Sequence, residues 1–222
     1  MTPEDRYCQL ADAVVNMDIA GLPGLVRDCL AAGLPPGEVV TRGLSAGMQR
    51  VGEGFRDGSV FMPEVLVSCD AYYAGLNVVK PLLDANGGVQ SKGKMVLGTI
   101  YGDIHTVGKD VAVPVFRAAG FEVIDLGIDV PDEKFVAAVR EHQPDLVGLG
   151  TYMTATFMHT KETVEALTRA GLRDRVKVIC GGPAVDAATA RKLGADDASD
   201  NAWEAVGKME ALVQELKHDC RR

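Results

Sequence analysis

The chain has 222 residues, of which 47% are hydrophobic and 24% are charged, an ordinary globular composition. With 23 Lys and Arg against 31 Asp and Glu, its net charge is −8, so its field repels phosphate backbones and anionic lipid, and we expect neither nucleic acid nor a membrane as a partner. The first residues lack the basic and apolar regions of a signal peptide, and the five widely spaced cysteines contain no C-x-x-C. A cytoplasmic location with free thiols is therefore expected.

The first 88 residues predict a bundle of four helices. Apolar side chains recur there at the spacing of one helix face, and short loops containing Gly, Pro or Asp-Gly separate the four patterns. Short connections favour antiparallel neighbours, so the four helices should form a small bundle. The patterns run from Leu10 to Met17, from Leu22 to Leu30, from Val40 to Phe55 and from Pro63 to Val79.

Residues 85–94 are rich in Gly and polar side chains. They predict a boundary between domains at 1–88 and 89–222, with Gly87 and Gly88 as a hinge. Beyond this connector, short apolar runs alternate with helical patterns, which predicts a parallel sheet wrapped by helices on both faces in a flavodoxin-like (Rossmann-like) order 2-1-3-4-5. The strands are expected at 95–101, 121–126, 145–149, 176–180 and 195–199, and the helices at 109–119, 133–142, 158–170, 186–193 and 202–217.

In such a sheet a ligand binds outside the carboxyl ends of the strands, where the strand order reverses. The loop after the first strand contains Asp103 and His105 in the pattern D-x-H-x-x-G. An imidazole is a good ligand for a transition metal, and a carboxylate on its other ring nitrogen fixes the tautomer and raises ligand basicity. We therefore expect a metal or ligand site at this loop, with Gly108 forming a tight turn into the next helix.

The loops after the third and fourth strands reach the same rim. Thr154 and Thr156 offer hydroxyl groups, and Gly181 and Gly182 leave the backbone open to a broad, flat ligand. Taken singly, each feature has a plainer interpretation. A loop histidine is usually solvated, a Gly-Gly pair is an ordinary strand-to-helix turn, and threonines commonly cap helices.

Taken together, these segments resemble the cobalamin-binding fold of corrinoid-dependent methyltransferases. The resemblance rests on Gly102 to Lys109, on the loop ending in Thr156 and on Gly181-Gly182, and Phe121 to Gly127 with Asp129-Val130-Pro131 is similar to the small corrinoid proteins of that group. The helical half, with Gly47 to Phe55 and Phe61 to Glu64, resembles their cap bundle. Five segments agree in order and spacing over nearly the whole chain.

The resemblance implies a cobalamin bound base-off/His-on, with His105 replacing the cofactor's dimethylbenzimidazole as the lower axial ligand of cobalt. Asp103 would hold His105, and Thr156 would extend that relay. The displaced nucleotide tail would lie in a slot lined by Thr154 and the Gly181-Gly182 turn, with Ala202 against the base, and Phe61 would shield the upper face. The implied cofactor-binding residues are Gly102, Asp103, Ile104, His105, Thr106, Gly108, Gly150, Thr151, Tyr152, Thr154, Gly181, Gly182, Ala202 and Phe61.

Three positions depart from the family's pattern. Thr106 follows the histidine where an acidic residue is common, Gly150-Thr151-Tyr152 replaces a Ser-x-Leu element, and Asn201-Ala202 replaces an Asp-Ala pair. The second change removes a hydroxyl that binds the tail, and Thr151 is expected to supply one from the neighbouring position.

The implied function is that of a methyl carrier whose cobalt cycles between Co(I) and methyl-Co(III). Its partners would be separate substrate and acceptor methyltransferases and a reductive activation protein. A second hypothesis is a cobalamin-dependent sensor. A third is a nucleotide-binding protein in which Asp103 and His105 perform acid-base work, although no G-x-G-x-x-G follows the first strand.

Overall fold

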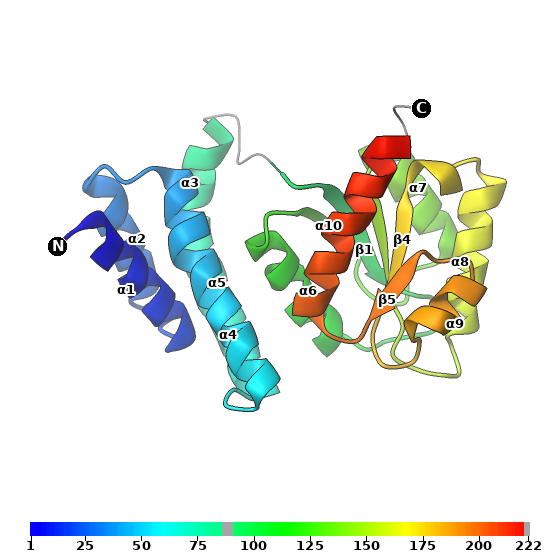
Figure 1. Ribbon diagram of the computed structural model, residues 1–222, viewed down its shortest axis with the longest axis horizontal. Coiled ribbons are helices and arrows are strands. Elements are labelled where there is room, and N and C mark those ends of the chain that lie inside the picture. Colours follow the sequence, from blue (N-terminus) through cyan, green and yellow to red (C-terminus); the bar gives the residue numbers. More distant parts are fainter. Residues whose placement is uncertain (86–90, 220–222) are drawn as a thin grey trace. The chain divides into compact units, whose positions relative to one another are not determined.

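The computed structural model describes residues 1–85 and 91–219 (Figure 1). The chain divides into two compact units, one of Met1–Gln90 with Ala118–Gly120 and one of Ser91–Arg117 with Phe121–Arg222. The predicted boundary after residue 88 and the predicted hinge at Gly87-Gly88 lie outside the described residues. In the described part of the chain, no helix combines the length and the apolar character that crossing a bilayer requires.

The helical unit contains the four predicted helices. Helix α1 begins at a capping box, in which the Thr2 side chain accepts from Asp5 N and the Asp5 side chain accepts from Thr2 N. The third predicted helix is continuous from residue 36 to 57 but contains a π-helical segment that the apolar spacing does not indicate. Its elements are α1 (Pro3–Val15), α2 (Leu22–Ala31), α3 (Pro36–Glu38), η1 (Val39–Leu44), α4 (Ser45–Asp57) and α5 (Met62–Ala85).

Small residues let these helices pack closely. A Cβ built on Gly47 of α4 would lie 2.7 Å from Val14 Cβ and 2.8 Å from the Ala11 carbonyl oxygen of α1, and one on Gly43 would lie 2.7 Å from Leu10 Cδ1. Leu10 and Val14 are fully buried. The apolar face of α1 therefore packs directly on the backbone of the third helix.

The second unit is a five-stranded parallel sheet in the order β2-β1-β3-β4-β5, which confirms the predicted 2-1-3-4-5 order. Each strand is followed by a helix, as right-handed crossovers require. The elements are β1 (Lys94–Thr99), α6 (Val107–Ala118), β2 (Glu122–Asp125), α7 (Asp132–His142), β3 (Leu146–Gly150), α8 (Met158–Arg169), η2 (Arg173–Arg175), β4 (Lys177–Gly181), α9 (Ala187–Lys192), β5 (Asp197–Ser199) and α10 (Ala202–Asp219).

Helices cover both faces of the sheet, with α7, α8 and α9 on one face and α6 and α10 on the other (Figure 1). The central strands are therefore apolar on both sides, and β3 is buried along its whole length. Phe135, Leu149 and Val178 are fully buried in the core cluster on the α7–α9 face.

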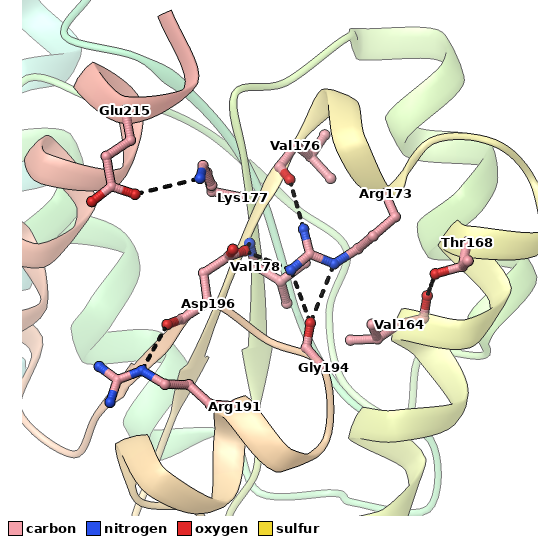
Figure 2. A network of polar contacts seen from close by, with 10 residues as sticks. All are labelled: Val164, Thr168, Arg173, Val176, Lys177, Val178, Arg191, Gly194, Asp196 and Glu215. Carbon is pink, nitrogen blue, oxygen red and sulfur yellow. Dashed lines mark hydrogen bonds and ion pairs between the residues drawn. The ribbon is translucent and has the colours of Figure 1, made fainter. Parts of the chain in front are cut away.

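A polar network fixes the amino ends of β4 and β5, the edge opposite the ligand loops (Figure 2). Arg173 donates to the Gly194 carbonyl at 3.2 and 2.8 Å, to the Val176 carbonyl at 3.1 Å and to Asp196 at 2.9 Å. Asp196 also accepts from Val178 N at 2.6 Å. Because Asp196 and Arg173 are each about one-fifth exposed, this network stabilises the sheet away from the site.

Candidate functional site

The loops after β1 and β3 meet at the carboxyl edge of the sheet. In parallel register, Thr99 at the end of β1 lies beside Gly150 at the end of β3. Ile100 N donates to the Gly150 carbonyl at 3.1 Å, and Thr151 N donates to the Gly181 carbonyl at 2.7 Å. The sheet pairing therefore continues into the loops and holds them at the point where the strand order reverses.

Asp103 organises this edge. Its carboxylate is completely buried and accepts five hydrogen bonds. Oδ1 accepts from His105 N at 3.1 Å and lies 2.7 Å from His105 Nδ1. Oδ2 accepts from Tyr152 N at 2.8 Å, Met153 N at 3.2 Å and Thr156 Oγ1 at 3.4 Å. One side chain thus joins the β1 loop to the β3 loop.

Burial alone raises the pKa of the Asp103 carboxyl. The hydrogen bonds from Tyr152 N and from the backbone N and ring Nδ1 of His105 outweigh this effect, so the pKa lies below its usual range. Asp103 is consequently ionised at neutral pH and only accepts hydrogen bonds. His105 Nδ1 must therefore carry the shared proton.

The other ring nitrogen of His105 is left for a ligand. Because Nδ1 donates to Asp103, the neutral imidazole carries its lone pair on Nε2. The side chain of His105 is 52% exposed, whereas that of Asp103 is fully buried. In many metal sites a carboxylate on one ring nitrogen orients the histidine whose other nitrogen binds the metal, and Asp103 holds His105 in the same way.

The kind of metal is limited by what surrounds the imidazole. Among the described residues, no group of three His, Cys, Asp or Glu side chains gathers to hold a bare metal ion. A single imidazole can still occupy one axial position of a metal that brings its own equatorial ligands. The single ring nitrogen of His105 therefore suits a metal that brings its other ligands with it.

Exposed apolar side chains lie on the loops after β1 and β3 and on the first turns of α6 and α8. Single exposed apolar residues are common, but a group on neighbouring loops marks a binding surface. Only Ile104 among them was predicted from the sequence. We call this group the apolar rim; it consists of Tyr101, Ile104, Val107, Met153 and Met158, which are 51%, 69%, 47%, 38% and 46% exposed.

Three glycines surround the Tyr152 ring. A Cβ on Gly108 would lie 2.3 Å from Tyr152 Cε1, one on Gly150 would lie 3.1 Å from Cε2, and one on Gly182 would lie 2.9 Å from Cδ1. We call this space the glycine crevice. Gly108 was expected to form a tight turn, but it lies within the first turn of α6, so close approach of Tyr152 is the reason for glycine here. Gly182 has a φ of +102° as well.

The structure corrects the role predicted for Thr151. Thr151 is fully buried, and its hydroxyl contacts Thr160 Oγ1 at 3.1 Å, so it does not offer a hydroxyl to the slot. Thr154 is exposed in the turn after β3, and its expected place beside the nucleotide tail stays a prediction. The hydroxyl that does reach Asp103 is that of Thr156.

The other predicted positions surround this centre. Exposed Thr106 precedes α6, and its carbonyl accepts from Asp110 N. Gly181 ends β4 with only the Ser199 carbonyl oxygen near its Cβ position, at 4.0 Å. Ala202 begins α10, which Asn201 caps by accepting from Trp203 N and Glu204 N.

Sequence reasoning gave no role to Asp129. It lies in the loop after β2 and accepts from Gly102 N at 2.7 Å, while its own N–H donates to the Asp103 carbonyl at 3.1 Å. Asp129 has a φ of +51°. The sequence signal that could have identified it is an Asp directly before Val130-Pro131, because Asp adopts positive φ more readily than most residues.

Phe61 belongs to the helical unit. It lies just before α5 and is 67% exposed. Its N–H donates to Glu64 Oε2 at 2.7 Å, which fixes the start of that helix. Its expected place over an upper corrin face stays a prediction.

The chain matches two families that are both described as B12 binding domain, one over residues 93–206 and the other over residues 8–80. It is 38% identical to trimethylamine corrinoid protein 1 of Methanosarcina acetivorans over 211 residues, which cover 95% of this chain and 98% of that protein. It is 37% identical to the dimethylamine corrinoid protein of Methanosarcina barkeri over 213 residues, which cover 96% and 100%.

Solved structures agree with these matches. A cobalamin-binding protein from Desulfitobacterium hafniense DCB-2 has a TM-score of 0.74 with 33% identity and covers 93% of this chain and 98% of its own. The methanol:cobalamin methyltransferase complex MtaBC from Methanosarcina barkeri gives a TM-score of 0.83 with 27% identity, covering 95% and 80%. With its helical unit and its five-stranded sheet both matched, the chain belongs to the family of small corrinoid proteins of methyltransferase systems.

Proposed function

We propose that this protein is the methyl-carrying corrinoid subunit of a methyltransferase system, with His105 as the lower axial ligand of a base-off cobalamin. The observation that carries the proposal is one half-exposed imidazole, held by a buried carboxylate and surrounded by the apolar rim and the glycine crevice. A bound corrinoid would supply a cobalt centre that accepts and donates methyl groups. The chain supplies the ligand, its orientation and the exclusion of water.

Asp103 and Thr156 act on the cofactor only through His105. Asp103 keeps the Nδ1 proton in place and turns Nε2 outward, which raises the basicity of the ligand nitrogen. The Thr156 hydroxyl lies 3.4 Å from Asp103 Oδ2 and 3.1 Å from the Met153 carbonyl oxygen, so it links the carboxylate to the loop after β3. Both are therefore positioning residues for a ligand that must bind and release its metal reversibly.

Separate methyltransferases are the expected partners. The relatives at 37–38% identity are named for trimethylamine and dimethylamine, and a similar structure is a methanol:cobalamin methyltransferase complex. A methyltransferase acting on a methylated amine is therefore the first substrate partner that we propose. A second methyltransferase, a reductive activation protein and a cytoplasmic location complete the proposal; the free thiols of Cys8, Cys29, Cys69 and Cys180 suit a reducing compartment. The comparisons give no support to a sensor.

Cofactor retention tests the proposal. The apoprotein is mixed with hydroxocobalamin, desalted and examined by absorption spectroscopy, alongside His105→Ala and the control His142→Ala. His142 ends α7 and lies near Glu141, outside the Asp103 network. We expect the parent and H142A to retain one corrinoid per chain with the same spectrum, whereas H105A retains less, with an altered spectrum. A colourless parent protein would refute corrinoid binding.

The carrier role needs a second stage. The loaded, reduced protein is added to a trimethylamine or dimethylamine methyltransferase, and consumption of the amine is followed. Consumption that depends on the loaded parent protein and is lost with H105A supports the carrier. A protein that retains corrinoid but supports transfer from no methylated amine or alcohol would contradict it.

A further inference from the structure

The glycine crevice is built from three separate segments and is filled by one side chain. Gly108 comes from the first turn of α6, Gly150 from the end of β3 and Gly182 from the turn after β4. At each of them an added Cβ would come within 3.1 Å of the Tyr152 ring. The Tyr152 ring therefore occupies the space that side chains at these three positions would need.

The Tyr152 ring lies next to His105. The rings of His105 and Tyr152 have centroids 5.9 Å apart with an interplanar angle of 39°. Anything that extends below a ligand of His105 and enters the sheet edge here must therefore meet the Tyr152 ring. The ring is also largely shielded from water, and this burial raises the pKa of its phenol to about 12.

The main chain of Tyr152 is fixed, so only its side chain can give way. Its N–H donates to the buried Oδ2 of Asp103 at 2.8 Å, and the carbonyl of the preceding Thr151 accepts from Ala184 N at 3.3 Å. Moving the backbone would break these bonds and disturb the carboxylate that holds His105. Rotation of the side chain leaves both intact.

We propose that Tyr152 is a specificity-determining residue that closes the glycine crevice and must rotate out before the nucleotide tail of a corrinoid can enter. This inference rests on the proposed function. It follows that the protein discriminates against corrinoids with a bulky lower base relative to corrinoids that lack a nucleotide. A smaller side chain at position 152 removes this discrimination.

The test compares two probes, hydroxocobalamin, which has the nucleotide tail, and diaquacobinamide, which lacks it. Their dissociation constants are measured by absorption titration of the apoprotein with the parent, Tyr152→Leu, Tyr152→Phe and Tyr101→Leu. We expect Y152L to bind hydroxocobalamin about tenfold more tightly, because no ring must be displaced, with cobinamide affinity changed by less than about twofold. Y152F keeps the ring and should behave like the parent.

Tyr101→Leu is the matched control, because Tyr101 belongs to the apolar rim and contacts His159, not the glycines. It should change the affinity for both probes by the same factor. If Y152L weakens hydroxocobalamin binding alone, or changes both affinities equally, the inference is wrong. If Y152L does not fold by circular dichroism, Tyr152→Met makes the same comparison. Binding of cobinamide with no effect of position 152 refutes only this inference, whereas no binding of either probe by the parent refutes the proposed function as well.

Discussion

Asp103 shows how a single side chain can define a site. Five hydrogen bonds converge on a carboxylate with no exposed surface, and all five donors are on His105 or in the loop after β3. A buried carboxylate is stable only when its acceptor sites are satisfied in this way. The same bonds that stabilise the charge therefore also orient the imidazole.

Replacing Asp103 with Asn tests this dependence. In Asp103→Asn one of the two carboxylate oxygens becomes an NH2 group, which cannot accept a hydrogen bond. It would face either the N and Nδ1 of His105 or the N–H groups of Tyr152 and Met153, so at least one donor loses its acceptor. We expect the free energy of unfolding to fall by about 2–4 kcal/mol, measured by urea denaturation of the apoprotein.

Asp186→Asn is the matched control for this substitution. Asp186 caps α9 by accepting from Thr189 N at 2.7 Å at an exposed position, and Asn caps a helix about equally well. Its stability should change by less than about 0.5 kcal/mol. Equal effects of D103N and D186N would contradict the role given to Asp103.

The pairing of Asp103 with His105 could be predicted because two residues of one loop are only two positions apart. The role of Tyr152 could not, because it depends on three glycines that are up to 74 positions apart in the chain and that only the folded sheet brings together. Thr151 was misplaced for a related reason. The Thr151 side chain points into the core, where its hydroxyl contacts that of Thr160. The residue types at the end of a strand do not indicate to which side each side chain points.

At the scale of elements, α6 carries a buried cation close to the site. Lys109 is only 7% exposed, and its ammonium group contacts Asp125 at the end of β2 at 2.7 Å and Asp110 at 3.0 Å. Burial alone lowers the pKa of Lys109, but the two carboxylates outweigh it, so the pKa is raised. The ion pair therefore fastens the first turn of α6 to the edge strand β2.

Removing this cation should destabilise the sheet unit. For Lys109→Met we expect a loss of about 2 kcal/mol in the free energy of unfolding at pH 7, because the hydrogen bonds from the buried ammonium group to Asp110 and Asp125 are lost. Lys161→Met is the control. Lys161 is about half exposed on α8, 3.7 Å from Glu165, and should cost less than about 0.5 kcal/mol. Urea unfolding followed by circular dichroism measures both, and equal losses would contradict the anchor.

The ion pairs of Lys109 make the free energy of unfolding depend on pH. Because the folded pKa of Lys109 is raised, its contribution is complete below the ordinary lysine pKa of about 10.4 and is lost as the pH rises through the folded value. The stability difference between the parent and K109M should therefore shrink above about pH 10.4. A difference that stays constant to higher pH would contradict the pairing.

In the sheet unit the predicted elements agree closely with the structure, because apolar spacing reports which face of each element is buried, whereas α1 begins at Pro3, before the pattern from Leu10, and α5 continues past Val79 to Ala85. The π segment Val39–Leu44 has no such signature. An extra residue in a helix shifts the apolar face by a fraction of a turn, and Val40 and Leu44 are both buried within this segment. Tertiary packing against α1, not local preference, fixes that feature.

At the scale of the whole molecule, the strand order determines where the chemistry lies. Strand order 2-1-3-4-5 brings the carboxyl ends of β1 and β3 together, and every residue of the Asp103 network belongs to the sheet unit. The alternation of strands and helices was enough to predict this order and therefore the edge. It could not predict what fills the crevice, because that depends on side-chain packing at the end of β3.

The central claim is that a nitrogen of His105 ligates the cobalt from below. The protein is produced with ¹⁵N-labelled histidine, loaded with unlabelled hydroxocobalamin and reduced to the cobalt(II) form for electron paramagnetic resonance. If His105 is the ligand, the superhyperfine lines are doublets in the labelled protein and triplets in the unlabelled one, and His105→Ala loses the doublet. Triplets in both samples would show that the cofactor's own base holds the metal and would contradict the account.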